Sequence, residues 1–223
     1  MTTAAPLIAL VHATPAAIAP ARAAIQETLP EATLWNVLDD RLQQDATRAG
    51  RGAPQLVERM RRLVSHVAAE GADAVLLTCS LYGFAAERLG SEIGLPVLSP
   101  DGAAFGDVLR AADERVLVLA SVPEALEDSR ARLTAAAGPR VLQIEGAVAD
   151  GAYEAASRGD RDALLDSLVA AVGNARADAI HLAQYSLSPV MRELADRTGT
   201  PVFAGPTSAA LALRARVEGA EAP

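Results

Sequence analysis

The chain repeats part of itself, and this repeat constrains the fold more than any other feature. Three pairs of segments recur at offsets of 105 or 108 positions: residues 73–80 (DAVLLTCS) and 178–185 (DAIHLAQY), 10–15 (LVHATP) and 118–123 (VLASVP), 95–98 (LPVL) and 200–203 (TPVF). The repeats of solenoid proteins are shorter, roughly 20–50 residues. The sequence therefore predicts two copies of one larger supersecondary unit.

Each copy has the pattern of strands that alternate with helices. Apolar runs typical of strands buried in a parallel sheet lie at residues 6–13, 32–38, 74–78, 96–99, 115–121, 141–145, 178–184 and 201–204. Helical patterns lie at about residues 17–28, 53–70, 82–89, 124–136, 160–175, 189–197 and 207–217, with another after Asp101. Residues 146–160 are rich in Gly, Ala and Asp, and we expect a loop or short helix there. This alternation predicts parallel sheets with right-handed crossovers.

The predicted fold class is α/β, with two pseudo-symmetric lobes and a site in the cleft between them. Each lobe is expected to hold a four-stranded parallel sheet flanked by helices. We expect residues 1–103 plus 206–223 to form the lobe that carries Cys79, and residues 104–205 to form the lobe that carries Gln184. These two residues fall on each other when the repeats are aligned.

Ligands of parallel α/β sheets bind outside the carboxyl ends of the strands. Polar residues gather at these predicted ends: His12, Thr14, Asp39, Asp40, Thr78, Cys79, Ser80, Ser99, Ser121, Gln184, Tyr185, Ser186, Thr207 and Ser208. Asp39 and Asp40 have the alternative interpretation of capping the next segment, and Arg41 beside them is a candidate carboxylate partner.

Composition excludes several classes of function. The net charge of -8 argues against a nucleic-acid surface, and no apolar run approaches the roughly 18 residues of a membrane helix. The sequence contains no lysine, so neither a pyridoxal phosphate Schiff base nor a Walker A loop is possible. The three histidines lack metal-ligand spacing. We therefore expect no cofactor and no metal. One cysteine allows no internal disulfide, and the absence of a signal-peptide pattern favours a cytoplasmic location.

With the duplicated order, Leu77-Thr78-Cys79-Ser80 resembles the first Thr-Cys-Asn turn of the aspartate/glutamate racemase superfamily. That superfamily includes hydantoin racemases, maleate isomerases and arylmalonate decarboxylases. Its second cysteine lies in a Gly-Cys-Thr-His turn. This turn matches Ala183-Gln184-Tyr185-Ser186, where all four residues are replaced.

The resemblance implies that Cys79 is the catalytic group. Two-thiol racemases remove a proton beside a carboxylate with one thiol and return a proton from the other face. A helix N-terminus lowers a thiol pKa from about 8.5, and Ser80 is a plausible cap there. Gln184 cannot take a proton at neutral pH, so Tyr185, His181 or His12 is left as a candidate second acid. A core role for His181 is the competing interpretation, and a buried structural thiol is the alternative for Cys79.

The expected substrate-binding residues are His12, Thr14, Thr78, Ser80, Ser121, Gln184 and Tyr185. His12 would supply a cation or a proton, and Ser121 would bind a carboxylate.

The predicted function is an isomerase, epimerase or decarboxylase that transfers a proton beside the carboxylate of a small acid or amino acid. A homodimer is expected by analogy with the family. The alternative is a non-catalytic small-carboxylate-binding protein on the same scaffold. A hydrolase with Cys79 as acyl nucleophile ranks lower, because no His–Asp pair stands beside it in sequence.

Overall fold

The structure of the chain is a computed structural model that describes residues 5–50 and 52–219. The chain divides into two compact units. Unit 1 comprises Met1–Gly102 and Ala209–Pro223, and unit 2 comprises Ala103–Ser208. Two helices, α5 (Gly102–Ala111) and α10 (Gly205–Val217), contain the points where the chain passes between the units.

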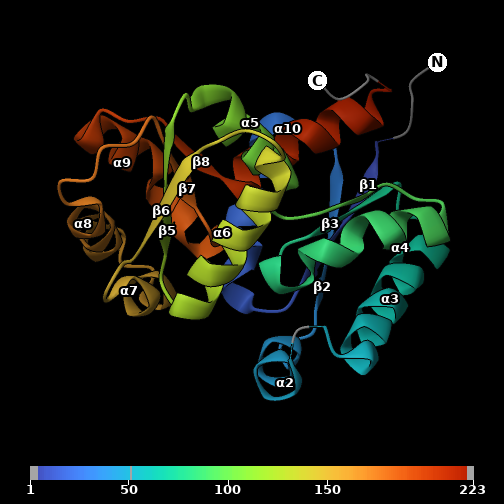
Figure 1. The fold of residues 1–223 in the computed structure, drawn as a ribbon. Coiled ribbons are helices and arrows are strands. Elements are labelled where there is room, and N and C mark those ends of the chain that lie inside the picture. The colour runs from blue at the N-terminus through green and yellow to red at the C-terminus, as the bar shows by residue number, and fades with distance from the viewer. Residues whose placement is uncertain (1–4, 51, 220–223) are drawn as a thin grey trace. The chain divides into compact units, whose positions relative to one another are not determined.

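Unit 1 is built on a four-stranded parallel sheet with the order β2-β1-β3-β4 (Figure 1). Its strands are β1 (Leu7–His12), β2 (Thr33–Leu38), β3 (Ala74–Leu77) and β4 (Val97–Leu98). Its helices are η1 (Pro15–Ala17), α1 (Ile18–Thr28), α2 (Leu42–Ala49), α3 (Pro54–Ala69), η2 (Ser80–Ala85) and α4 (Ala86–Ile93), where η marks 3₁₀ geometry.

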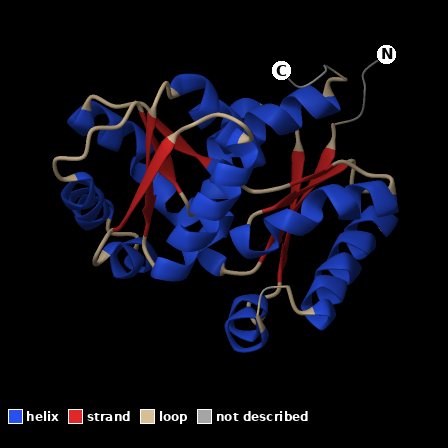
Figure 2. Cartoon of the chain, viewed as in Figure 1, coloured by secondary structure: helices blue, strands red, loops and turns tan. Residues whose placement is uncertain are grey.

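Unit 2 has the same architecture, with a parallel sheet of order β6-β5-β7-β8. Its strands are β5 (Arg115–Ala120), β6 (Gln143–Val148), β7 (Ala179–Leu182) and β8 (Val202–Ala204). Its helices are α6 (Pro123–Ala137), α7 (Ala152–Arg158), α8 (Arg161–Val172), η3 (Tyr185–Val190) and α9 (Met191–Thr198). Figure 2 shows both sheets flanked by helices. The predicted α/β fold class, with two four-stranded parallel sheets flanked by helices, is confirmed.

The repeat extends to the register of the strands. Ile8 pairs with Ala74 in unit 1, and Val116 pairs with Ala179 in unit 2. These are the offsets of 108 and 105 seen in the sequence. Both helices that follow the third strand end at a glycine with positive φ, Gly94 at 74° and Gly199 at 66°. A left-handed residue is a common helix terminator, and only glycine adopts it without steric cost.

The central strands are buried because helices cover them. In unit 1, β1 and β3 pack with buried residues of α2, α3, η2 and α4 in one cluster that also includes Cys79. In unit 2, one face of β5 and β7 packs against α7, α8 and α9, and the other face packs against α5 and α6. This double cover explains why the inner strands are continuous apolar runs and do not alternate.

Several predicted boundaries need correction. Strand β6 spans Gln143–Val148, not residues 141–145, and residues 146–160 complete this strand and form the short helix α7. Helix α2 was not expected from the sequence. The helix expected at residues 82–89 is a 3₁₀ turn, η2, that runs into α4.

Candidate active site

Cys79 lies beyond the carboxyl end of β3, between this strand and η2. It stands two residues after Leu77, the last residue of β3, and occupies the N-cap position of η2. Its carbonyl oxygen accepts the N–H of Tyr82 at 3.1 Å, and 9 % of the residue is exposed. Ser80 is the first residue of η2, and no side chain caps this helix, so the prediction of a Ser80 cap is wrong. Ser80 is half-buried.

Two predicted site residues of unit 1 contact each other. His12 is the last residue of β1, and Thr78 follows β3. His12 Nδ1 lies 2.8 Å from Thr78 Oγ1, and His12 Nε2 lies 3.1 Å from Asn36 Oδ1 in β2. Thr78 Oγ1 also lies 3.3 Å from the carbonyl oxygen of Val11. His12 is fully buried and only 4 % of Thr78 is exposed, so the hydrogen bond between these two side chains is shielded from water.

The expectation that His12 supplies a cation is not supported. Burial lowers the pKa of His12 below its ordinary value, although the hydrogen bond to Asn36 opposes this effect. The neutral imidazole is therefore favoured. Thr14, two residues further along, is half-buried at the N-cap of η1, and its side chain makes no capping hydrogen bond.

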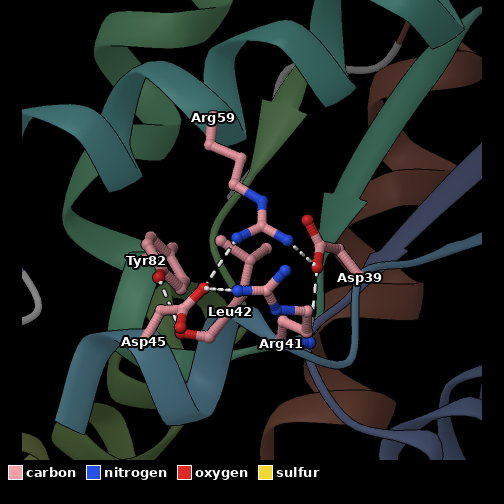
Figure 3. Close-up of polar contacts among 6 residues, drawn as sticks. All are labelled: Asp39, Arg41, Leu42, Asp45, Arg59 and Tyr82. Carbon is pink, nitrogen blue, oxygen red and sulfur yellow. Dashed lines mark hydrogen bonds and ion pairs between the residues drawn. The ribbon is translucent and has the colours of Figure 1, made fainter. Parts of the chain in front are cut away.

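Tyr82 connects the Cys79 turn to α2. It is fully buried, and its phenol donates to the carbonyl oxygen of Leu42 at 3.1 Å (Figure 3). Burial, followed by the negative charge of the Cys79 thiolate, raises the pKa of Tyr82 to about 12. The phenol is thus a neutral hydrogen-bond donor over the whole working range of pH. Tyr82 and Cys79 belong to the same cluster of buried residues in unit 1.

An arginine holds the segment after β2 in place. Arg59 of α3 donates to Asp39 at 2.5 Å and to Asp45 of α2 at 2.8 Å (Figure 3). Asp39 also accepts the backbone N–H of Arg41 at 3.3 Å, which closes a turn ahead of α2; the N-cap residue of α2 is Arg41 itself, without a side-chain cap. The Arg41 side chain is 73 % exposed and lies 3.8 Å from Asp45. Sequence reasoning missed Arg59, because nothing in its helical pattern separates it from its solvent-facing neighbours.

In unit 2, the predicted residues Ser121 and Gln184 form a pair. Gln184 follows β7 as Cys79 follows β3, and it occupies the N-cap position of η3. Its Oε1 accepts the backbone N–H of Ser121 at 2.7 Å and the Ser121 hydroxyl at 3.0 Å. Ser121 is 8 % exposed. The position equivalent to the thiol is therefore an amide fixed to the end of β5.

The two candidate acids of unit 2, His181 and Tyr185, are both buried. His181 is fully buried within β7, and its ring meets that of Phe105 edge to face at 5.1 Å between centroids. This placement agrees with the core interpretation of His181. Tyr185 begins η3 and is 4 % exposed. Its carbonyl oxygen accepts the Ser188 hydroxyl at 2.8 Å.

Two features are absent from the part of the chain that the structure describes, a cluster of metal ligands and a membrane-spanning helix. No group of three or more His, Cys, Asp or Glu side chains there could hold a metal ion. None of the described helices has the length and apolar character to span a membrane.

Comparison with known structures supports the fold. Allantoin racemase from Klebsiella pneumoniae superposes with a TM-score of 0.71 at 14% identity, over 98% of this chain and 91% of that chain. Glutamate racemase from Campylobacter jejuni gives 0.68 at 14% identity, over 94% and 85%. An arylmalonate decarboxylase gives 0.71 at 19% identity, over 98% and 96%. No curated protein matches the chain in sequence.

The family comparison covers nearly the whole chain. Residues 9–215 match the family described as Asp/Glu/Hydantoin racemase. This range includes both units and every candidate residue described above. The chain belongs to the Asp/Glu/Hydantoin racemase family.

Proposed function

We propose that the chain is a cofactor-independent enzyme that transfers a proton at the carbon beside the carboxylate of a small acid or amino acid, through Cys79. The observation that carries this proposal is the place of Cys79. The chain's only thiol stands at the carboxyl end of a central strand, at the N-cap of a helix, in a member of a racemase family. Ligands of parallel α/β sheets bind at such strand ends. The lack of lysine supports independence from pyridoxal phosphate.

The chemical step follows from the properties of a thiol. The thiolate takes the proton from the α-carbon, the C–H electrons pass into the carboxylate as an enediolate, and an S–H bond forms. Return of the proton to carbon regenerates the thiolate. If the substrate loses carbon dioxide instead, Cys79 begins as the neutral thiol: its S–H protonates the resulting enediolate, and the thiolate that is left takes a proton from water. Thr14, Ser80, Ser121 and Tyr185 remain proposed partners of the substrate, while the His12 and Thr78 side chains bind each other.

Gln184 restricts the mechanism to one thiol. A neutral amide does not act as a general acid or base at neutral pH, and its oxygen already accepts two hydrogen bonds from Ser121. A single thiol fits a decarboxylase or an isomerase, and it fits a racemase only together with a different second acid. The same amide favours the second candidate function, a non-catalytic protein that binds a small carboxylate.

The deciding experiment is exchange of the substrate α-hydrogen in heavy water, followed by NMR over a panel of small amino, hydroxy and malonate-type acids. We expect exchange or decarboxylation with the wild type and loss of both in Cys79→Ser, with ligand binding retained. Tight binding of one acid without any exchange would replace the enzyme with the binding protein. We also propose a homodimer, which sedimentation equilibrium tests.

Alkylation of Cys79 supplies a second readout. An active-site thiolate reacts quickly and is protected by substrate, whereas a structural thiol resists until the protein unfolds. Protection by the same acid that undergoes exchange would link the two experiments.

A further inference from the structure

Three polar side chains meet beneath the Cys79 turn, one from each of three neighbouring strands of unit 1. His12 ends β1, Asn36 lies in β2, and Thr78 follows β3 immediately before Cys79. The His12 ring bridges the other two side chains, at 2.8 Å to Thr78 Oγ1 and 3.1 Å to Asn36 Oδ1. We call these three residues the His12 network.

The partners fix the direction of each hydrogen bond. The Asn36 carbonyl oxygen accepts, so His12 Nε2 carries the proton of the neutral ring. His12 Nδ1 then accepts, and the one proton of the Thr78 hydroxyl goes to it at 2.8 Å in preference to the Val11 carbonyl at 3.3 Å. Burial lowers the pKa of His12 and favours this neutral form. Asn36 therefore sets the tautomer, and the tautomer sets which way the Thr78 hydroxyl proton points.

The fold itself does not require this network. Position by position, unit 2 carries Ala120 where unit 1 has His12, Gly146 where it has Asn36, and Ala183 where it has Thr78. The backbone is the same in both units at this point: the N–H of Thr78 donates to Val11 at 3.0 Å, and the N–H of Ala183 donates to Leu119 at 2.9 Å.

In unit 2, other side chains fill the volume that corresponds to the Asn36 side chain of unit 1. A Cβ at Gly146 would lie 2.6 Å from Leu126 Cδ1 and 2.8 Å from Arg130 Cδ, so these two side chains occupy the volume that Asn36 uses in unit 1. Two copies of one architecture thus reach the same strand register with and without these three polar side chains, of which His12 and Thr78 are buried and Asn36 is half-buried. Buried polar groups cost free energy to desolvate. Because only unit 1 carries these polar groups, they call for a role that is specific to unit 1. The two units also differ at the next position of the chain, which is Cys79 in unit 1 and Gln184 in unit 2.

We propose that His12 is a positioning residue for Cys79: by holding the Thr78 hydroxyl, it fixes the backbone that presents the thiol. This inference rests on the proposed function, in which Cys79 is the reactive group. It changes the sequence-based role of His12 and Thr78 from binding substrate to orienting the thiol. A misplacement of about 1 Å at a reacting group can cost ~100-fold in rate, so a network one residue away can control turnover.

The test compares matched threonine variants. Thr78→Val removes the hydroxyl and keeps the shape, and Thr78→Ser keeps the hydroxyl. Thr28→Val is the control, because it removes a threonine hydroxyl whose hydrogen bond goes to a backbone carbonyl, that of Ala24 at 2.8 Å, and not to a histidine. Thr28 ends α1 just before β2 begins, at the opposite end of the sheet from Cys79.

The first readout needs no substrate. We expect Thr78→Val to loosen the turn and raise the alkylation rate of the 9 % exposed Cys79 about fivefold or more, while Thr78→Ser and Thr28→Val stay within about twofold. Imidazole ¹⁵N spectra should show the Nε2–H tautomer of His12 in the wild type and a changed His12 signal in Thr78→Val. Equal alkylation rates in all three variants, or an Nδ1–H tautomer in the wild type, would overturn the proposal.

The second readout separates this proposal from the proposed function. With an active substrate, we expect Thr78→Val to lower kcat about tenfold or more with little change in KM, and Thr78→Ser to restore it. An active enzyme whose kcat is the same in Thr78→Val and wild type would sink the positioning role and leave the function standing. If no substrate is turned over, the function fails, and the alkylation rates still decide whether His12 holds the Cys79 turn.

Discussion

Replacing Gln184 with methionine tests how much the hydrogen bonds of the Gln184 side chain stabilise unit 2. Gln184 is the residue of unit 2 that is equivalent to Cys79 in unit 1. Methionine matches glutamine in length and lacks its acceptor. The change removes two hydrogen bonds from Ser121, of 2.7 Å to its backbone N–H and 3.0 Å to its hydroxyl. Each is worth about 0.5–1.5 kcal/mol net, and the unpaired N–H in an 8 % exposed residue adds a desolvation cost. We expect Gln184→Met to lower the free energy of unfolding by about 2 kcal/mol.

Urea unfolding followed by far-UV circular dichroism measures this loss. Ser121→Ala removes only the hydroxyl and should cost about 1 kcal/mol. Gln184→Glu keeps an accepting oxygen and should stay within about 1 kcal/mol of wild type at neutral pH. The single tryptophan, Trp35, lies in unit 1, so its fluorescence shows whether that unit responds to a change in unit 2. A Gln184→Met protein as stable as the wild type would refute the reasoning.

Three further perturbations follow from the structure. Tyr82→Phe leaves the Leu42 carbonyl without its buried donor and should cost about 1–2 kcal/mol in urea unfolding; an unchanged midpoint would mean that water replaces the phenol. Stability should fall as pH drops from 6.5 towards the lowered pKa of folded His12, because the unfolded chain binds that proton first. The slope is at most about 1.4 kcal/mol per pH unit, and His12→Gln should remove it from a pH series of unfolding curves. Asp178 accepts the N–H groups of Glu114, Arg115 and Asp113, which lowers its pKa. Asp178→Ala should therefore lower the thermal midpoint at pH 7, and the difference from wild type should shrink as pH falls through the folded pKa below 3.8; a constant difference would contradict this.

The duplicated sheets could be predicted because their central strands, β1, β3, β5 and β7, are buried along almost their whole length. Such strands must be continuous apolar runs, and these runs are visible in sequence with their repeat offsets. Helix α2 was missed since its residues, LQQDATRA, are mostly polar. The repeat itself carried a signal for it, because α7 occupies the equivalent place in unit 2.

The candidate site was predictable at the level of strand ends but not of contacts. His12 and Thr78, and likewise Ser121 and Gln184, were each named as site residues, and each pair proved to be hydrogen-bonded. Asn36 was not foreseen, because an asparagine in the middle of an apolar strand shows its partner only once the register of β1 and β2 is known.

The two units show which part of the chain can vary without loss of the fold. Both use the same strand order, register and terminal backbone hydrogen bonds. They differ in the side chains placed at the carboxyl ends: a thiol next to a His–Thr–Asn network in one, and an amide bound to a serine in the other. Because the shared backbone forms the same sheet in both units, we expect function to be encoded in the side chains that differ. One unit has kept a group able to move a proton, and the other has an amide that can only accept or donate hydrogen bonds.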